Sequence, residues 1–407
     1  MDALMVGVSG MRGTIGSSLT PRVVGDMAAA FAAWIKRKRP AGDAGAPRVV
    51  IGRDSRPSGP WVRDAAVAAL VASGVEVIDL DLVTTPGVEM MVTHLKADGG
   101  VIITASHNPI EWNGLKMLNS LGISAKRYKV VLDSVNGAGC VPTATMLSKL
   151  GCRLVHLGGK PDGQFSHEPE PTAKNLTQLA EEVVRQGADV GFAQDPDADR
   201  LAIVDENGRY IGEEYSLVLC AQWLMSRPGK TGAVAVVNLS SSRMLDDVAR
   251  ANGGRVVRTP VGEANVIAAM HRENAIVGGE GNGGVIDPRI VPGRDSLVGM
   301  AYVLQLMAAT GKQISQLIAQ IPRYEIVKDK LPCPRPAADR AVAALKEHFA
   351  SEKVDTQDGI RIDWADGWIH ARASNTEPIM RIIAEATDQK TAQARIAEVR
   401  GIVEGII

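Results

Sequence analysis

Aromatic residues and cysteines are scarce in this chain of 407 residues. Phe, Tyr and Trp together make up 4% of the residues, so the hydrophobic cores must be built mainly from Val, Ile, Leu, Ala and Met. The cysteines form no C-x-x-C pair and no cluster with histidine, which argues against the usual zinc and redox motifs. We therefore expect reduced, partly buried thiols, as in a cytosolic protein, at Cys140, Cys152, Cys220 and Cys333.

Clustered positive charge and long apolar runs are also missing. The formal net charge is −1, and the absence of a basic run argues against a nucleic-acid partner, because binding to phosphate backbones needs clustered Lys and Arg. No apolar run reaches the ~18 residues of a membrane span. The first residues lack the basic region and apolar core of a secretory signal. We expect a cytoplasmic protein without a membrane partner.

Short β-branched runs, each followed by a helical pattern, recur along most of the chain. The runs at residues 48–55, 129–137 and 233–240 have the continuous apolar character of strands that are buried on both faces. Helical patterns follow, for example at residues 60–73 and 241–252. This alternation predicts right-handed βαβ units and mixed, mostly parallel sheets. The wide spacing of the runs indicates a repeat of whole α/β domains.

Turn-rich and proline-rich segments indicate the domain boundaries. A chain of this length predicts two to four domains, and such segments lie near residues 122–126, 227–230 and 330–336. The domains that we expect are 1–124, 125–228, 229–328 and 329–407. The last differs in pattern, with a helix at 337–351, short strands within 360–372 and 380–385, and a helix from residue 391. The predicted fold class is therefore α/β, with three related domains and a small C-terminal α+β domain.

The first candidate site is the segment T-A-S-H-N-P at residues 104–109, which follows an apolar strand pattern at 100–103. A serine at the end of such a strand lies where α/β proteins bind ligands. The hydroxyl of Ser106 would need a base, a metal or an attached phosphate to react. No G-x-S-x-G motif surrounds it, which argues against a hydrolase. A purely structural polar turn explains the segment equally well by itself.

The second candidate site is the segment D-P-D-A-D-R at residues 195–200. Its three carboxylates, on Asp195, Asp197 and Asp199, can converge on one cation, and Mg²⁺ prefers oxygen ligands. The glycine and the late glutamate of an EF-hand are absent at the required positions. A solvated acidic turn is the alternative, although a cation would relieve the repulsion between the carboxylates.

Two further polar loops follow. The glycine-rich loop at residues 278–284 allows close approach of a ligand, and Glu280 and Asn282 suit neighbouring sugar hydroxyls; a flexible loop is the alternative. The last loop combines hydroxyl, amide and guanidinium groups that suit a phosphate, although a polar turn between strands is also possible. Its candidate phosphate ligands are Arg372, Ser374, Asn375, Thr376 and Arg381.

Two single residues are weaker candidates. The glycine-rich run at residues 7–14 carries Arg12, and Lys116 lies shortly after the first site. Lys116 is a candidate proton carrier or phosphate contact, with an ordinary exposed lysine as the alternative.

Taken in this order, the five segments resemble those of the α-D-phosphohexomutase family, from residue 7 to residue 381. The resemblance implies four domains around a central cleft, phosphorylation of Ser106, and interconversion of hexose 1- and 6-phosphates through a hexose 1,6-bisphosphate. It also implies Mg²⁺ bound by the three aspartates together with a phosphoserine oxygen. Charge on the transferred group would be stabilised by Arg12, Lys116 and Arg200. Glu280, Asn282 and Thr259 would contact the sugar, and residues 372–381 the second phosphate. Such an enzyme is expected to be a monomer or a homodimer.

The chain departs from the family pattern at three places. Gly284 and Asn282 replace a histidine and a serine that many members have, which leaves Lys116 and His107 as candidates for proton transfer. This variant resembles a subgroup that is often archaeal. Pro260 stands where many members have a lysine, whose contact Arg258 would have to supply. Only nine residues, 119–127, stand where members carry several dozen more.

Two other hypotheses remain open at this point. The same serine and cation would serve a metal-dependent sugar phosphatase, and the short segment after residue 118 would suit a catalytically silent sugar-phosphate-binding protein. The residues do not distinguish glucose, mannose and glucosamine phosphates.

Overall fold

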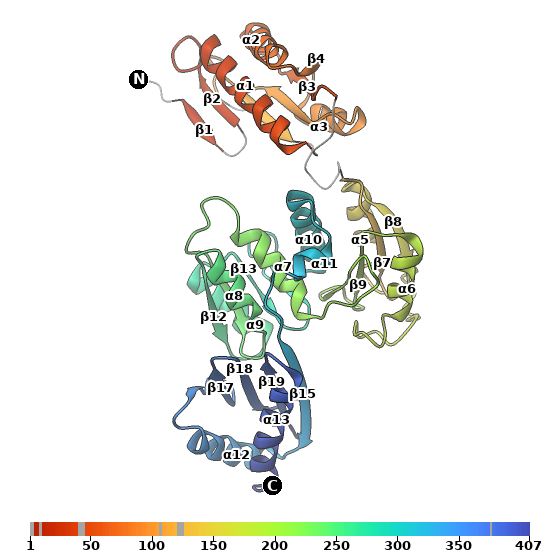
Figure 1. The fold of residues 1–407 in the computed structure, drawn as a ribbon, viewed down its shortest axis with the longest axis vertical. Helices are drawn as coiled ribbons and strands as arrows, with labels where there is room; N and C mark the ends of the chain where they lie inside the picture. Colours follow the sequence, from red (N-terminus) through yellow and green to blue (C-terminus); the bar gives the residue numbers. More distant parts are fainter. Residues whose placement is uncertain (1–3, 8–9, 40–44, 106–107, 120–125, 375–376) are drawn as a thin grey trace. The chain divides into compact units, whose positions relative to one another are not determined.

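The computed structural model describes residues 4–7, 10–39, 45–105, 108–119, 126–374 and 377–407. The chain forms two compact units, Met1–Arg127 and Tyr128–Ile407 (Figure 1). The predicted central cleft stays a prediction.

The first unit is a sheet with helices on both faces. Its strand order is β1-β2-β6-β5-β3-β4. The bounds are β1 (Met5–Gly7), β2 (Gly10–Thr14), β3 (Arg48–Arg53), β4 (Glu76–Leu82), β5 (Gly99–Ile103) and β6 (Trp112–Asn119). β3 pairs in parallel with β4 and β5, whereas β1, β2 and β6 pair antiparallel. The antiparallel strands make this sheet less parallel than the pattern of apolar runs indicates.

Alternate residues of β3 enter different cores, which explains its continuous apolar run. Val49 and Ile51 pack with helices α1 (Pro21–Lys38) and α2 (Gly59–Ala72). Val50 lies on the opposite face, in a cluster with residues of α3 (Thr85–His94). Side chains alternate between the two faces of a strand, so a strand covered on both faces must be apolar at every position.

The second unit contains three sheets. The first has the order β10-β9-β7-β8, and the second has the order β12-β11-β13-β14. Their strands are β7 (Lys129–Asp133), β8 (Arg153–Leu157), β9 (Val190–Gln194), β10 (Leu201–Val204), β11 (Val234–Asn238), β12 (Arg255–Thr259), β13 (Val277–Glu280) and β14 (Gly284–Ile286). The accompanying helices are α5 (Cys140–Lys149), α6 (Thr177–Gln186), α7 (Glu214–Met225), α8 (Met244–Ala251), α9 (Glu263–Glu273), α10 (Ser296–Thr310) and α11 (Ile314–Ile318).

The same four-strand arrangement occurs three times. In β3–β6, β7–β10 and β11–β14, the first strand pairs in parallel with the second and the third, and the fourth strand pairs antiparallel with the third. The predicted repeat of related α/β domains is therefore confirmed in the topology, and the predicted fold class is confirmed with it.

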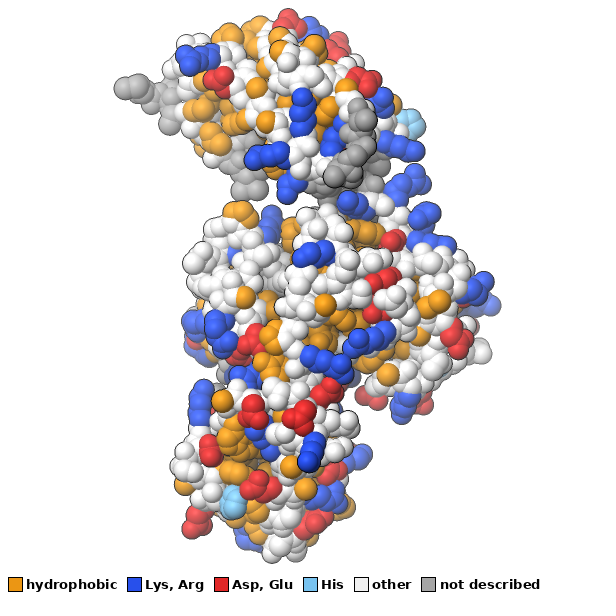
Figure 2. Space-filling view, in the orientation of Figure 1, with side chains coloured by type: hydrophobic (Ala, Val, Ile, Leu, Met, Phe, Trp, Pro, Cys, Tyr) orange, Lys and Arg blue, Asp and Glu red, His pale blue; other side chains and the backbone are white. Residues whose placement is uncertain are grey.

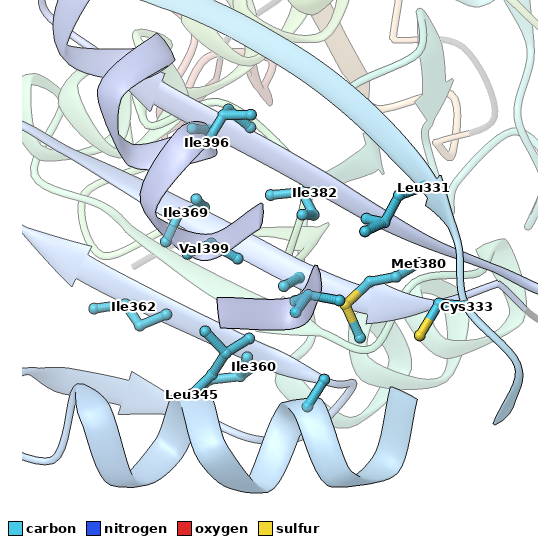
Figure 3. Packing of buried hydrophobic residues seen from close by; sticks show 14 of the residues in the cluster. Leu331, Cys333, Leu345, Ile360, Ile362, Ile369, Met380, Ile382, Ile396 and Val399 are labelled. Carbon is cyan, nitrogen blue, oxygen red and sulfur yellow. The ribbon is translucent and has the colours of Figure 1, made fainter. Parts of the chain in front are cut away.

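The last sheet is antiparallel, in the order β15-β19-β18-β17-β16. Its elements are β15 (Glu325–Pro332), α12 (Arg335–His348), β16 (Lys353–Asp355), β17 (Ile360–Trp364), β18 (Gly367–Ala373), β19 (Ile379–Ala386) and α13 (Gln389–Glu404). Both helices pack on it, and their residues Leu345, Ile396 and Val399 share one core with the strand residues Ile360 and Ile382 (Figure 3). This is the small α+β domain that the sequence predicts.

Two elements lie across the boundaries expected from the sequence. β15 pairs with β19 from Glu325 onward, which is before residue 329. Pro332 lies in β15 because this is an edge strand, where a missing N–H need not break a ladder. Helix α7 packs against α8, α10 and β13, so we propose that the third domain begins near Glu214 and not at residue 229.

The cysteines match their prediction. All four are free, and Cys140, Cys220 and Cys333 are buried. Burial raises the pKa of Cys152 to about 11, which keeps this thiol protonated at neutral pH.

Candidate active site

Three of the predicted site segments occupy the same place in the repeated fold. Each lies at the turn between the third strand of its repeat and the antiparallel fourth strand. The serine segment follows β5 and the aspartate segment follows β9, whereas the predicted segment 278–284 begins within β13, forms the turn at 281–283 and ends at the first residue of β14. The carboxyl ends of parallel strands are where α/β proteins bind ligands. The topology thus gives the serine, aspartate and glycine-rich segments equivalent positions.

The loop after β5 is held by a partly buried set of polar side chains. Ser106 and His107 lie outside the described residues. Beside them, the Thr104 hydroxyl donates to Asp54 Oδ2 at 2.7 Å. Arg56 Nη2 donates to the carbonyl of Asn108 at 2.7 Å, and its Nη1 donates to the carbonyls of Pro109 and Trp112. Arg56 therefore fixes the return path of the loop, a role that the sequence pattern does not indicate.

Arg12 and Lys116 lie on one face of the sheet beside this loop. Arg12 is opposite Gly114, and Lys116 is opposite Gly10, so both side chains point to the same side. Arg12 Nη1 donates to Asn108 Oδ1 at 3.2 Å, which links β2 to the serine loop. Arg12 thus contacts the serine loop and Lys116 shares its face of the sheet, and the catalytic roles of both stay predictions.

The aspartate loop wraps around its first carboxylate. Asp195 Oδ1 accepts the backbone N–H groups of Asp199 and Arg200, at 3.1 and 3.0 Å. Ala198 has φ of +62°, a left-handed conformation that closes the turn. As a result, one ligand oxygen from each of Asp195, Asp197 and Asp199 lies within 4.8 Å of the others.

Burial and mutual repulsion disfavour the ionised form of Asp195, and one oxygen of Asp199 lacks a hydrogen-bond partner. Burial, followed by the neighbouring aspartates, raises the pKa of Asp195 to about 7. Asp199 Oδ1 is buried without a hydrogen-bond partner among the described residues. Arg200 Nε lies 3.6 Å from Asp195 Oδ2 and 3.9 Å from Asp199 Oδ1, and makes no hydrogen bond there. An unpaired buried oxygen in an all-oxygen cluster fits Mg²⁺.

Glu280, at the end of β13, is fixed by amides on both sides. Asn238 Nδ2 donates to its Oε1 at 2.9 Å, and Asn282 Nδ2 lies 3.5 Å from its Oε2. The next residue, Gly281, has no room for a side chain, because a Cβ there would stand 2.0 Å from Glu214 Oε1. The loop thus holds a carboxylate whose remaining lone pairs can accept hydroxyl donors.

Arg294 joins the aspartate loop to the glutamate loop, and sequence analysis missed it. Its Nη2 bonds Asp199 Oδ2, and its Nη1 donates to Glu280 Oε2 at 3.2 Å. Its backbone N–H donates to Glu263 Oε1 at 2.7 Å. Asp199 is 95 residues away in the chain, so no local spacing could have indicated the contact.

The hairpin β18–β19 carries the predicted phosphate cradle. Arg372 and Arg381 stand directly opposite each other, so their side chains share a face of the sheet. Like charges in such a pair repel each other. Asp358 pairs with Arg372 and Glu377 with Arg381, and an anion between the two arginines would relieve the repulsion further. Ser374 begins the connecting turn, with its N–H bonded to the carbonyl of Ile379. Asn375 and Thr376 lie outside the described residues.

Asp358 connects this cradle to the third repeat. One oxygen, Oδ2, accepts both Arg372 Nε at 2.9 Å and the backbone N–H of Val261 at 3.1 Å. The Thr259 hydroxyl donates to backbone carbonyls, among them that of Pro260 at 3.0 Å. Arg258 pairs with Asp246 at 2.5 Å, so this guanidinium is already engaged and is a weak substitute for the family lysine.

Comparison with known proteins assigns the family. Four domain models of phosphoglucomutase/phosphomannomutase match: α/β/α domain I at residues 3–130, domain II at 114–208, domain III at 213–324 and the C-terminal domain at 330–402. A Thermococcus kodakarensis phosphoglucomutase/phosphomannomutase is 36% identical, with 96% of each chain covered. A Methanopyrus kandleri protein named as a probable phosphoglucosamine mutase is 33% identical, with 95% of each covered.

The same comparisons bear on the short segment after residue 118. The alignment with the Thermococcus protein spans 444 positions, 37 more than the 407 residues of this chain, so that protein has at least this many residues without a counterpart here. The matches to the models of domains I and II overlap at residues 114–130. The predicted shortening at the junction of the first two domains stays a prediction.

A solved structure extends the likeness to three dimensions. A phosphoglucomutase/phosphomannomutase family protein from Burkholderia thailandensis matches with a TM-score of 0.62 and 26% identity, covering 98% of this chain and 96% of the other. All four domains, their order and their folds agree with this assignment. The chain therefore belongs to the phosphoglucomutase/phosphomannomutase (α-D-phosphohexomutase) family, and it is an intramolecular phosphotransferase.

Proposed function

We propose that this enzyme interconverts a hexose 1-phosphate and a hexose 6-phosphate through phosphorylated Ser106 and a hexose 1,6-bisphosphate. In the first half-reaction the phosphorus–oxygen bond to Ser106 breaks, and a new bond forms to the free sugar hydroxyl, whose proton leaves to a base. The bisphosphate then turns over, and its other phosphate returns to Ser106. The equivalent positions of the serine, aspartate and glycine-rich loops are the observation that carries the proposal.

The aspartate loop is the proposed cation site. Asp195, Asp197 and Asp199 would hold Mg²⁺, which would supply positive charge to the phosphoryl oxygens. Arg200, Arg12 and Lys116 would add cationic donors to the same group. Phosphoryl transfer depends mainly on such positioning and electrostatic stabilisation. Lys116 and His107 stay the candidates for moving the proton of the sugar hydroxyl.

The other loops would hold the parts of the sugar phosphate that do not react. Glu280 and Asn282 would accept and donate hydrogen bonds to ring hydroxyls. Arg372, Arg381 and Ser374, with Asn375 and Thr376, would bind the second phosphate, which would relieve the repulsion between the paired arginines.

The names of the relatives leave the sugar open, because one is a phosphoglucomutase/phosphomannomutase and another a probable phosphoglucosamine mutase. The purified protein with Mg²⁺ is therefore assayed with glucose, mannose and glucosamine phosphates. We expect conversion of at least one 1-phosphate to its 6-phosphate, with a rate raised by the matching bisphosphate. Conversion of none refutes the proposal, and tight binding without turnover indicates the silent binding protein.

Two measurements separate the mutase from a phosphatase. Release of inorganic phosphate as the main product would identify the phosphatase. Ser106→Ala should abolish both the mutase activity and the phosphate that mass spectrometry finds on the protein. A phosphorylated Ser106→Ala protein would contradict the assignment of the nucleophile.

The remaining expectations concern partners. Among the described residues, no helix has both the length and the apolar character needed to cross a membrane. Acidic and basic side chains intermingle on the face shown in Figure 2. The cytoplasmic location and the monomeric or dimeric state stay predictions.

A further inference from the structure

Arg294 occupies the space that a side chain at position 284 would need. A Cβ built on Gly284 would stand 2.3 Å from Arg294 Cδ and 3.0 Å from its Cγ. Gly284 of β14 pairs with Glu280 of β13 and has no left-handed φ, so the main obstacle to a larger residue is the side chain of Arg294, followed by Asn282 Oδ1 at 3.2 Å. Gly284 and Arg294 therefore form one structural unit.

The guanidinium of Arg294 is shared among three carboxylates. It bonds Asp199 in the aspartate loop and Glu280 in the glutamate loop, and its Nε lies 3.5 Å from Glu263 Oε2. Its side chain is only 15% exposed, so these contacts are weakly screened by water. A planar guanidinium can hold two carboxylates with separate N–H groups, which a lysine ammonium on one atom cannot do in the same way.

The two loops do not depend on Arg294 for their backbone positions. Leu201 N–H donates to the carbonyl of Gly283 at 3.0 Å, which joins the end of the aspartate loop to the glutamate loop. The Ser296 hydroxyl donates to the carbonyl of Ala198 at 2.6 Å, which fixes the turn of the aspartate loop. Loss of the Arg294 side chain should therefore free two carboxylates without displacing their loops.

We propose that Arg294 is a positioning residue of the mutase site, which fixes Glu280 for the sugar ring and weakens cation binding at the aspartate cluster. The inference rests on the proposed function, because it assumes a cation and a sugar in these two loops. The charge of Arg294 opposes a cation beside Asp199, and its geometry holds the Glu280 carboxylate between two donors, Arg294 Nη1 and Asn238 Nδ2. Removing it should move the two affinities in opposite directions.

The test measures both affinities by titration calorimetry on the full chain. The probes are Mg²⁺ alone and, at saturating Mg²⁺, the 1-deoxy analogue of the hexose 6-phosphate that the wild type converts; the analogue has no 1-hydroxyl and accepts no phosphoryl group. For Arg294→Ala we expect Mg²⁺ to bind about tenfold more tightly and the analogue about tenfold more weakly. Arg294→Lys keeps the charge, so Mg²⁺ affinity should stay near that of the wild type while the analogue still binds more weakly.

Two further variants exclude a general structural effect. Gly284→Ala should weaken binding of the analogue in the wild type, because the new Cβ displaces Arg294. The effect should be much smaller once Arg294 is already Ala, where only Asn282 Oδ1, 3.2 Å from the new Cβ, stays close. Arg255→Ala removes an exposed guanidinium paired with Glu273 in the same domain, and should leave both affinities unchanged.

The possible outcomes are distinct. Parallel loss of both affinities in Arg294→Ala, or no change in either, overturns the inference. A Gly284→Ala effect that is equally large with and without Arg294 overturns it as well. If the wild type converts no hexose phosphate, the proposed function fails first, and the inference fails with it. If the wild type converts a hexose phosphate but Arg294→Ala has the same Mg²⁺ and analogue affinities as the wild type, the inference alone is refuted.

Discussion

Ionisation of Glu214 lowers the free energy of unfolding as pH rises, and a substitution can measure this effect. This carboxyl is buried beneath the glycine-rich loop, where its Oε2 accepts the N–H of Ser242 at 3.0 Å and its Oε1 leaves no room for a Cβ on Gly281. Burial is the main cause that raises the pKa of Glu214 from 4.5 to about 8. The buried Glu385 nearby adds to the effect.

The sign and size of the effect follow from linkage. The folded state holds the proton more tightly than the unfolded state, so stability is full below about pH 4.5 and is lost as pH rises to about 8. At about 1.4 kcal/mol for each pKa unit, the interval from 4.5 to about 8 corresponds to roughly 5 kcal/mol. Glu214→Gln keeps the shape and an acceptor oxygen, and removes the ionisation.

The assay compares urea unfolding midpoints of the wild type and Glu214→Gln at pH 6 and pH 9. We expect the variant to gain about 3 kcal/mol of stability relative to the wild type between these values, because the two pKa units from pH 6 to about 8 lie within the assay and only the wild type must ionise a buried group. Other titrating groups are common to both proteins and cancel in the difference. Parallel pH dependence of the two proteins would refute the assignment of this cost to Glu214.

Two further predictions concern the fourth domain. Asp358→Ala should raise KM for the hexose phosphate about tenfold with a smaller change in kcat, because Arg372 loses the carboxylate that orients it. Steady-state kinetics measure both constants, and an unchanged KM would show that Arg372 needs no such partner. His370 is buried between Ser240 and the carbonyl of Asp358, and burial lowers its pKa to about 4. In this pH range His370 is protonated in the unfolded chain and neutral in the folded protein, so stability should fall as pH drops from about 6.5 to about 4. In His370→Gln the unfolding midpoint should depend less on pH over this range. An equal pH dependence of the midpoints in both proteins would exclude His370 as the source.

Local sequence was sufficient for the parts of the site that lie within one loop. The serine, aspartate and glycine-rich segments were recognisable because each is a short polar motif directly after a buried strand, and a strand with both faces covered must be continuously apolar. The paired Arg372 and Arg381 were also found, since a hairpin brings residues of neighbouring segments together. The fold class followed from the same alternation of strands and helices.

Only the tertiary structure could decide which side chains hold these loops in place. Arg294 reaches Asp199 across 95 residues, and Asp358 reaches Val261 across 97, because the chain folds through several elements before these groups meet. Partners so far apart follow no spacing rule, since their contact depends on how whole sheets and helices pack. The strand at Pro332 and the place of α7 were likewise set by pairing and packing, not by local propensity. Sequence by itself thus predicted the chemistry that each loop would carry, and the packing of distant elements determined which charged groups contact these loops.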